Sequence, residues 1–391
     1  RQKKLPGTFF TPLKIEMAAN ETEAAQIVLY SEEKLTDISI ECSSLYSKDK
    51  LCIDTTQIFI APVGYVNPPE PAYLSDLDEW IPDPLIDTKK HFTIEAQHYQ
   101  PIWFEVNTSA EQKPGDYYGE VSFYKNKEKI LSVPVEIKVW NFRLPDHFSF
   151  PVVISSDFRF SKTGSQFERF YGSDAAISEA RNYMFSEKPD KNILSEEALH
   201  LVELGEELVD LFKKHHLPND HFYRHLSVPI PGWQRREHRD EKTFFCLGYD
   251  ASPNPVEILA PQVEAMREEN SLPYAYVYGY DEIRTQKEFD QMKQRYGAIK
   301  KHFPELKLMC TALDYTCGIR TGTSEVVDIW VMPSPNYMHM LPAAKRARAD
   351  GKQVWWYPCN WPYPPTANLL LENTGSATRL KMGFMPWKFA V

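Results

Sequence analysis

Two adjacent carboxylates, Asp281 and Glu282, directly follow residues 276–280, a run of aromatic and β-branched side chains broken by one glycine. Such a run predicts a buried parallel strand, and carboxylates at the carboxyl end of a parallel strand lie where α/β barrels keep their catalytic groups. The alternative is that the pair belongs to a solvated loop or caps the next helix. Thr285 and Glu288 already form a capping-box pattern for that helix, which leaves the two carboxylates without a structural role. We therefore interpret the pair as part of an active site.

The adjacency of the two carboxylates restricts the chemistry. Glycosidases that use two protein carboxylates hold them about 5 Å apart when retaining and about 6.5–9.5 Å apart when inverting, usually on separate strands. Neighbours in a regular strand point to opposite faces, so Asp281 and Glu282 share a pocket only if the strand breaks at its tip. This arrangement fits a division of labour in which one carboxyl protonates the leaving oxygen and the other positions a nucleophile of the substrate.

The first part of the chain is rich in strand signals. Short alternating or β-branched runs are separated by turns such as residues 113–116, and few residues suggest a long amphipathic helix. The clearest runs are residues 26–30, 102–106, 119–124 and 133–139. The pattern predicts an antiparallel β-sandwich domain over residues 1–145.

After Pro145 the pattern changes to strands that alternate with helices, which predicts a (β/α)8 TIM-like barrel over residues 146–391. Expected strands are residues 151–155, 221–226, 276–282, 306–312, 326–332 and 354–359, with a doubtful one at 244–247. Four helices are expected: one that begins at Ser195, one over residues 264–270, one that follows Thr285, and one over about 338–350. Seven strands of eight are found before Val391, so the barrel is expected to be incomplete at the C-terminus, truncated before its last strand.

Composition narrows the class of ligand. The chain has 391 residues, a net charge of −10 and a pI near 5.6, which argues against nucleic acid as a partner because nucleic-acid binding needs a basic footprint. Aromatic residues make up 13%, and their flat faces are suited to packing against sugar rings. No membrane span is expected, and no signal peptide is recognised after Arg1, since no apolar segment of sufficient length follows.

No metal site or cofactor is expected. The histidines at 215, 216, 221 and 225 are clustered, but their spacing is not that of a metal motif. Two of them lie near the C-terminal end of a helix, where a histidine interacts favourably with the helix dipole. The six cysteines include no CxxC pair, although Cys42 and Cys52 could form a disulfide across a hairpin. Motifs of serine hydrolases, P-loop NTPases and dinucleotide-binding folds are absent from the sequence.

Four segments in order resemble glycoside hydrolase family 123, the β-N-acetylgalactosaminidases and their relatives. They are residues 21–26 before an apolar strand, Pro-Gly-Asp-Tyr-Tyr-Gly at 114–119, Tyr-Gly-Tyr-Asp-Glu at 278–282, and Val-Trp-Trp-Tyr-Pro-Cys at 354–359 followed by Pro364, Pro365 and Asn368. One departure is Glu372, where the family often has aspartate. The likeness covers nearly the whole chain and implies a β-sandwich followed by a (β/α)8 barrel.

The resemblance implies a substrate-assisted retaining mechanism without a cofactor. Glu282 would act as general acid and base, and Asp281 would orient the 2-acetamido group, whose oxygen attacks the anomeric carbon. Tyr357 would donate a hydrogen bond to that acetamido oxygen. The substrate would be an oligosaccharide or glycoconjugate with terminal β-linked N-acetylgalactosamine, and the family implies a secreted or periplasmic protein.

Other candidates for binding the substrate rest on position. Trp361 and Tyr363 follow the last expected strand in a proline-rich loop on the catalytic side and are expected to stack on a sugar face. Arg224, near the tip of the second strand, and Asp157, beyond the first, are expected to bind hydroxyl groups, and Tyr337 is a further substrate-binding candidate. The alternative function is a catalytically silent carbohydrate-binding or scaffold protein with the same fold.

Overall fold

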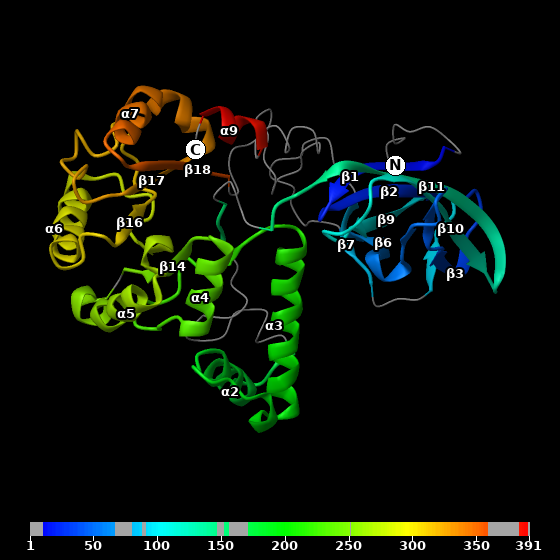
Figure 1. The fold of residues 1–391 in the computed structure, drawn as a ribbon, viewed down its shortest axis with the longest axis horizontal. Coiled ribbons are helices and arrows are strands. Elements are labelled where there is room, and N and C mark those ends of the chain that lie inside the picture. The colour runs from blue at the N-terminus through cyan, green and yellow to red at the C-terminus, as the bar shows by residue number, and fades with distance from the viewer. Residues whose placement is uncertain are drawn as a thin grey trace. The chain divides into compact units, whose positions relative to one another are not determined.

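The computed structural model describes residues 11–66, 80–87, 91–146, 152–155, 171–250, 252–358 and 383–389. The chain divides into two compact units, Arg1–Asp146 and His147–Val391. Figure 1 shows the first unit as β-strands and the second as strands with helices.

The first unit consists of two sheets around one hydrophobic core. One sheet has seven strands: five in the order β1-β11-β10-β3-β8, then β4, which pairs with β10, and β5, which pairs with β4. The other sheet has the order β2-β9-β6-β7. All pairings are antiparallel except that of β1 with β11. Buried side chains of both sheets, such as Val121 and Phe104, belong to one cluster. The bounds are β1 Leu13–Ala19, β2 Thr22–Tyr30, β3 Leu35–Cys42, β4 Leu45–Ser47, β5 Cys52–Ile53, η1 Thr55–Gln57, β6 Ile58–Val66, β7 Ile81–Leu85, β8 Phe92–Ile94, β9 Tyr99–Asn107, β10 Gly115–Lys125 and β11 Glu128–Arg143.

The Pro-Gly-Asp-Tyr-Tyr-Gly segment has a structural role in this unit. Gly115 begins β10 with φ of 151°, a conformation that L side chains rarely adopt. Tyr117 is fully buried and its hydroxyl donates to the carbonyl oxygen of Lys113 at 2.7 Å. A Cβ atom at Gly119 would lie 2.8 Å from Oγ of Ser43. The glycines and the tyrosine therefore fix the entry into the hairpin of β10 and β11.

The second unit contains a parallel sheet of five strands in the order β14-β15-β16-β17-β18, and β12 pairs in parallel with β13. Helices α4 to α7 run along the outer side of this sheet (Figure 1). The bounds are β12 Ile154–Ser155, α2 Asp174–Met184, η2 Lys191–Ile193, α3 Glu196–Lys214, β13 Asn219–Asp220, α4 Gly232–Glu241, β14 Phe245–Tyr249, α5 Pro255–Glu269, η3 Leu272–Tyr274, β15 Ala275–Tyr278, α6 Gln286–His302, β16 Lys307–Cys310, β17 Ile329–Pro333, η4 Ser334–Asn336, α7 Tyr337–Ala349, β18 Gln353–Tyr357 and α9 Met385–Phe389.

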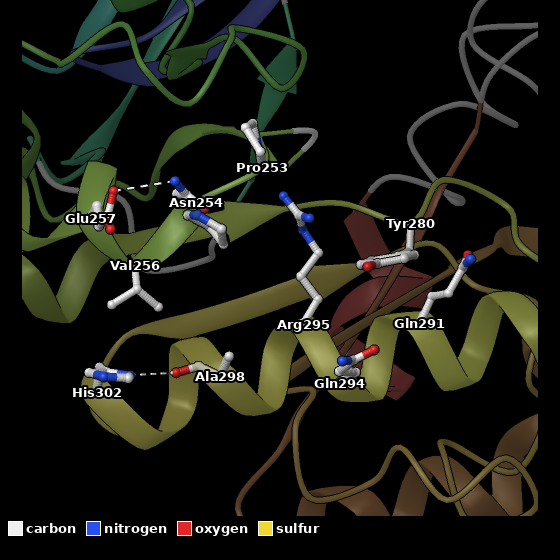
Figure 2. A pocket seen from close by; sticks show the side chains of 11 residues that line it. Pro253, Asn254, Val256, Glu257, Tyr280, Gln291, Gln294, Arg295, Ala298 and His302 are labelled. Atoms are coloured by element: carbon white, nitrogen blue, oxygen red, sulfur yellow. Dashed lines mark hydrogen bonds between the residues drawn. The ribbon is translucent and has the colours of Figure 1, made fainter.

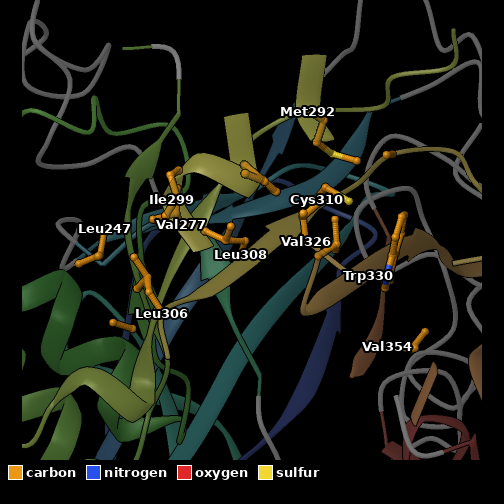
Figure 3. Packing of buried hydrophobic residues seen from close by; sticks show 14 of the residues in the cluster. Leu247, Val277, Met292, Ile299, Leu306, Leu308, Cys310, Val326, Trp330 and Val354 are labelled. Atoms are coloured by element: carbon orange, nitrogen blue, oxygen red, sulfur yellow. The ribbon is translucent and has the colours of Figure 1, made fainter. Parts of the chain in front are cut away.

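The two faces of the parallel sheet bury different side chains. Val277, Leu308 and Trp330 point toward the helices and pack with Met292 and Ile299 of α6, as Figure 3 shows. The opposite face carries a second cluster, formed by Cys246, Tyr276, Tyr278, Met309, Ile329 and Val331. Because strand side chains alternate, the tyrosines at 276 and 278 lie on this inner face.

The predicted combination of a β-sheet part and an α/β part is confirmed at that level, whereas the sandwich geometry and a closed eight-stranded barrel stay predictions. The expected strand at 221–226 is wrong: residues 221–228 are turns and bends apart from a single bridge from His225 to Tyr249. The carboxylate of Asp220 accepts the backbone N–H groups of His221 at 2.7 Å and Cys246 at 3.0 Å, and so replaces part of a strand ladder.

The helix expected at 264–270 begins earlier, at Pro255, and Pro261 lies inside it. An interior proline is normally a sign of a helix end, which is why the pattern predicted only the last two turns. The short helix α4 was not predicted. Cys42 and Cys52 are both free thiols, so the possible disulfide is not formed.

No helix in the described ranges is both long and apolar enough to cross a membrane.

Candidate active site

The carboxylates Asp281 and Glu282 follow β15, whose four residues are all buried. The strand ends at Tyr278, and the backbone then takes left-handed conformations at Tyr280, with φ of 57°, and at Glu282, with φ of 49°. Left-handed backbone costs non-glycine residues free energy and is concentrated at functional sites. The regular alternation of side chains along the strand is therefore broken at the two carboxylates, which is required if both are to face the same pocket.

Asp281 is surrounded by hydroxyl groups from three parts of the chain. Its Oδ1 atom accepts hydrogen bonds from Tyr278 at 2.7 Å and from Thr311 at 2.7 Å, and its Oδ2 atom accepts one from Tyr223 at 2.9 Å. The backbone N–H of Asp281 donates to the hydroxyl of Tyr249 at 3.3 Å. Donors on both oxygens hold the carboxylate in one orientation.

The three tyrosines around Asp281 also contact one another. The ring of Tyr249 lies edge-on to that of Tyr278, with centroids 5.2 Å apart, and the ring of Tyr223 lies 5.6 Å from that of Tyr278. Burial raises the pKa of Tyr278; partial burial of the Tyr223 hydroxyl, on a residue that is otherwise exposed, together with the charge of Asp281 raises the pKa of Tyr223 to about 12. Tyr278 and Tyr223 therefore keep their protons at neutral pH and donate to Asp281.

Glu282 is held from a different strand. The hydroxyl of Tyr357, the last residue of β18, donates to its Oε1 atom at 2.6 Å. The backbone N–H of Glu282 donates to the hydroxyl of Thr311 at 3.0 Å. Arg284 lies 3.8 Å from Oε2 of Glu282, but both side chains are substantially exposed and such a pair contributes little.

A buried polar group lies beneath the site on the same inner face. Asp220 accepts a hydrogen bond from the hydroxyl of Tyr276 at 2.7 Å, two residues before Tyr278. Arg224 is also buried, and its guanidinium donates to the carbonyl oxygen of Cys246. The structure thus places Arg224 in the interior, below the carboxylates rather than beside them.

Not all predicted site residues come together. The structure brings Asp281, Glu282 and Tyr357 into one group, but Tyr357 contacts Glu282 instead of standing apart to bind the substrate. Tyr337 is fully buried in the core, edge-on to Trp356 and with Arg348 donating to its hydroxyl at 2.7 Å. Asp157, Trp361, Tyr363, Asn368 and Glu372 lie outside the described residues.

Sequence reasoning missed Tyr223, Tyr249 and Thr311. Thr311 is the first residue after β16, the strand next to β15, so the rule that singled out Asp281 also applied to it. Tyr223 lies on a turn 58 residues from Asp281, and no local pattern marks its contact.

A cavity of about 760 Å³ lies on the helix side of the site. Figure 2 shows Arg295 of α6 and Tyr280, the residue before Asp281, on its wall. Arg295 forms two hydrogen bonds to Asp250, at 2.6 and 2.9 Å, and the side chain of Asp250 has no exposed surface. The carboxylates of Asp281 and Glu282 are not among the described residues that line this cavity. Its closeness to Tyr280 is therefore no evidence that it holds the substrate.

In the described part of the chain, no cluster of three or more His, Cys, Asp or Glu side chains is arranged to hold a metal ion.

Comparison with known proteins points to one family. Residues 13–125 match the family model described as the glycoside hydrolase 123 N-terminal domain. The fold is similar to that of a family 123 glycoside hydrolase from Clostridium perfringens, at 12% identity and a TM-score of 0.58, over 90% of this chain and 69% of that one. The structural work on that enzyme concerned glycolipid glycan hydrolysis. No curated protein sequence matches the chain.

Two other glycosidase structures are less similar. The β-glucuronidase of Bacteroides uniformis matches at 10% identity and a TM-score of 0.23, over 87% of this chain and 39% of that one. A family 39 glycoside hydrolase from Bacteroides cellulosilyticus matches at 12% identity and a TM-score of 0.26, over 82% of this chain and 56% of that one. TM-scores this low carry no argument about the fold.

The family-model match over residues 13–125 supports a glycosidase. More particularly, the predicted resemblance to glycoside hydrolase family 123 is confirmed.

Proposed function

We propose that this chain is a glycoside hydrolase that releases terminal β-linked N-acetylgalactosamine by a substrate-assisted retaining mechanism. Glu282 is the general acid and base, and Asp281 orients the 2-acetamido group. The observation that carries the proposal is the turn that presents these two adjacent carboxylates, with left-handed backbone at Tyr280 and Glu282 and separate hydroxyl partners for each side chain.

In the first step Glu282 gives its proton to the glycosidic oxygen while the acetamido carbonyl oxygen attacks the anomeric carbon. The bond to the leaving group breaks, and the sugar becomes a cyclic oxazoline-like intermediate with positive charge on its ring. Asp281 accepts the amide N–H and stabilises that charge. In the second step Glu282 takes a proton from water, whose oxygen attacks the anomeric carbon and reopens the ring with net retention.

The partners of the carboxylates support this division of roles. Asp281 receives three hydroxyl donors, which hold its carboxylate in place beside the positive charge that develops on the substrate. Glu282 has one hydroxyl donor, Tyr357, on Oε1, so its Oε2 atom is the better placed to carry a transferable proton. We assign Tyr357 the role of orienting Glu282. The predicted bond from Tyr357 to the acetamido oxygen then requires the phenol to change its partner.

The competing function is a carbohydrate-binding or scaffold protein that has the fold without turnover. The full-length protein should hydrolyse an aryl N-acetyl-β-galactosaminide if the proposal is right. Binding of N-acetylgalactosamine without release of the aryl group would favour the binding protein. Secretion or a periplasmic location stays a prediction from the family resemblance.

A conventional retaining mechanism would use a protein carboxylate as the nucleophile, with Asp157 and Asp250 as candidates. Asp250 is poorly suited, because its carboxylate is buried and paired with Arg295. A thiazoline analogue of N-acetylgalactosamine should inhibit strongly, since it mimics the cyclic intermediate, and the plain galactoside should be almost inert. A covalent glycosyl-protein adduct found by mass spectrometry at any carboxylate would refute the substrate-assisted mechanism.

A further inference from the structure

We propose that the two oxygens of Asp281 have separate roles: Oδ1 is locked by Thr311 and Tyr278, whereas Oδ2 exchanges Tyr223 for the amide N–H of the substrate. This inference rests on the proposed function and deepens it. It adds Thr311 and Tyr278 as positioning residues and Tyr223 as a displaceable partner.

The lock on Oδ1 is made of buried groups. Thr311 has 7% of its surface exposed and Tyr278 has 2%, and each donates to Oδ1 at 2.7 Å. Each hydroxyl has one proton, and both protons are used on Oδ1, so the 3.2 Å contact between the two hydroxyls needs no proton of its own. Breaking either bond would leave a buried hydroxyl without its acceptor, which is costly.

Thr311 also connects the two carboxylate residues. Its Oγ1 atom donates to the side chain of Asp281 and accepts the backbone N–H of Glu282 at 3.0 Å. One hydroxyl at the tip of β16 thereby fixes a carboxylate oxygen of the first residue and the left-handed backbone of the second. Thr311 therefore sets how the acetamido-binding group and the proton donor stand relative to each other.

The partner of Oδ2 differs in burial and in support. The side chain of Tyr223 is on a turn, and the residue is 57% exposed. Its hydroxyl donates to Oδ2 at 2.9 Å, and its ring rests on that of Tyr249 at 5.7 Å. An exposed phenol can leave this position and bond to water at little cost, whereas the buried donors on Oδ1 cannot. The amide N–H of the substrate therefore replaces the phenol of Tyr223 at Oδ2.

The first test compares Thr311→Val with Thr311→Ser in the full-length protein. Valine keeps the shape of threonine but removes the hydroxyl; we expect kcat on an aryl N-acetyl-β-galactosaminide to fall about 10- to 100-fold, as for a lost hydrogen bond to a charged group. The thiazoline analogue should lose affinity by a similar factor. Serine keeps the hydroxyl and should restore both values to within about threefold. If Thr311→Val does not fold, Tyr278→Phe tests the same oxygen.

The second test is Tyr223→Phe, which keeps the ring and removes the competing donor. Because the phenol must leave Oδ2 before the amide binds, its loss should lower KM for the acetamido substrate. A 2-deoxy-galactoside has no donor at C2 to replace the phenol, so as a competitive inhibitor it should bind less well to this variant than to the wild type. Opposite changes for the two sugars would not follow from a merely structural role.

The outcomes separate the inference from the proposed function. No hydrolysis by the wild-type protein would overturn the proposed function itself. Hydrolysis by the wild type together with full kcat in Thr311→Val and Tyr278→Phe would overturn the lock on Oδ1. A loss of kcat in Tyr223→Phe as large as in Thr311→Val would show that Tyr223 stays on Asp281 in the transition state, and would overturn the exchange at Oδ2.

Discussion

Tyr357 donates its hydroxyl proton to Oε1 of Glu282 across 2.6 Å, although 75 residues separate the two in sequence. Tyr357 is the last residue of β18 and Glu282 follows β15, and two strands lie between β15 and β18 in the sheet. In a flat sheet three strand spacings of about 4.8 Å would separate the strand tips by about 14 Å. The side chains bridge this gap from the inner face of the sheet, where Tyr357 packs with the cluster that includes Tyr278.

Glu282→Gln should remove the acid and base functions while keeping an acceptor oxygen for Tyr357. We expect kcat/KM to fall by about 10²–10⁴-fold on an aryl N-acetyl-β-galactosaminide, with a larger loss for poorer leaving groups because they depend more on protonation. The control is Asp290→Asn, an exposed acidic residue on α6, which should be neutral. Equal losses across leaving groups would speak against Glu282 as the acid.

Asp281→Asn should be similarly severe in kcat without unfolding the protein. The amide oxygen can still accept from Tyr278 and Thr311, and its NH₂ group can donate to the oxygen of Tyr223, so the contacts survive while the negative charge is lost. Thermal unfolding and steady-state kinetics on the same sample separate the two effects. Near-normal turnover would rule out the substrate-assisted assignment.

Tyr357→Phe should lower kcat about 10- to 100-fold, since a hydrogen bond that orients a carboxylate at the site is removed. The effect should be largest for substrates with a poor leaving group, for which the position of Glu282 matters most. Tyr315→Phe removes the hydroxyl of an exposed tyrosine and serves as the control. If both variants keep full kcat, the bond from Tyr357 to Glu282 has no role in the reaction.

Arg295→Leu should destabilise the second unit, because it leaves the carboxylate of Asp250 buried without a partner. A buried pair broken on one side costs about 3–5 kcal/mol, which urea unfolding can measure. The exposed pair of Lys191 and Glu206 is the comparison, and Lys191→Met should cost about 0–1 kcal/mol. The double variant Asp250→Asn/Arg295→Leu should recover part of the loss. Equal costs for the two single variants would contradict this account.

Tyr296→Phe should make the stability of the protein less sensitive to alkaline pH. Burial raises the pKa of Tyr296 well above its ordinary value, and its hydroxyl donates to the carbonyl oxygen of Met309 at 2.7 Å. Above about pH 10 the unfolded chain loses this phenol proton while the folded chain keeps it, so the stabilisation present below pH 10 is lost as pH rises. The free energy of unfolding, measured in urea from pH 8 to 11, should decline less steeply in the variant. Identical slopes would contradict the raised pKa.

The sequence predicted the strand at the site, but not the contacts at its tip. The run before Asp281 and the capping box of Thr285 and Glu288 are local patterns, and the structure has both. The contacts of Tyr223 and Thr311 with Asp281 cross between segments and depend on how the strand tips approach each other, which periodicity does not record.

Burial was the other source of error. Arg224 was expected near a strand tip and Tyr337 was a further substrate-binding candidate, but both are buried. Each has a hydrogen-bond partner inside the protein, the first the carbonyl oxygen of Cys246 and the second Arg348. A sequence marks a polar residue as exposed by default, and only the fold reveals an internal partner. The domain boundary expected after residue 145 rested on a local proline signal. The first compact unit of the structure ends at Asp146.

The left-handed residues on either side of Asp281 set the spacing of the two carboxylates within one short turn of backbone. Where acid and nucleophile stand on different strands, any flexing of the sheet changes the distance between them. Here the two groups belong to adjacent residues joined by one peptide bond, so they move together when the sheet flexes. The two carboxylates therefore form one rigid unit, and the backbone spacing between them is preserved even if the curvature of the supporting strands changes.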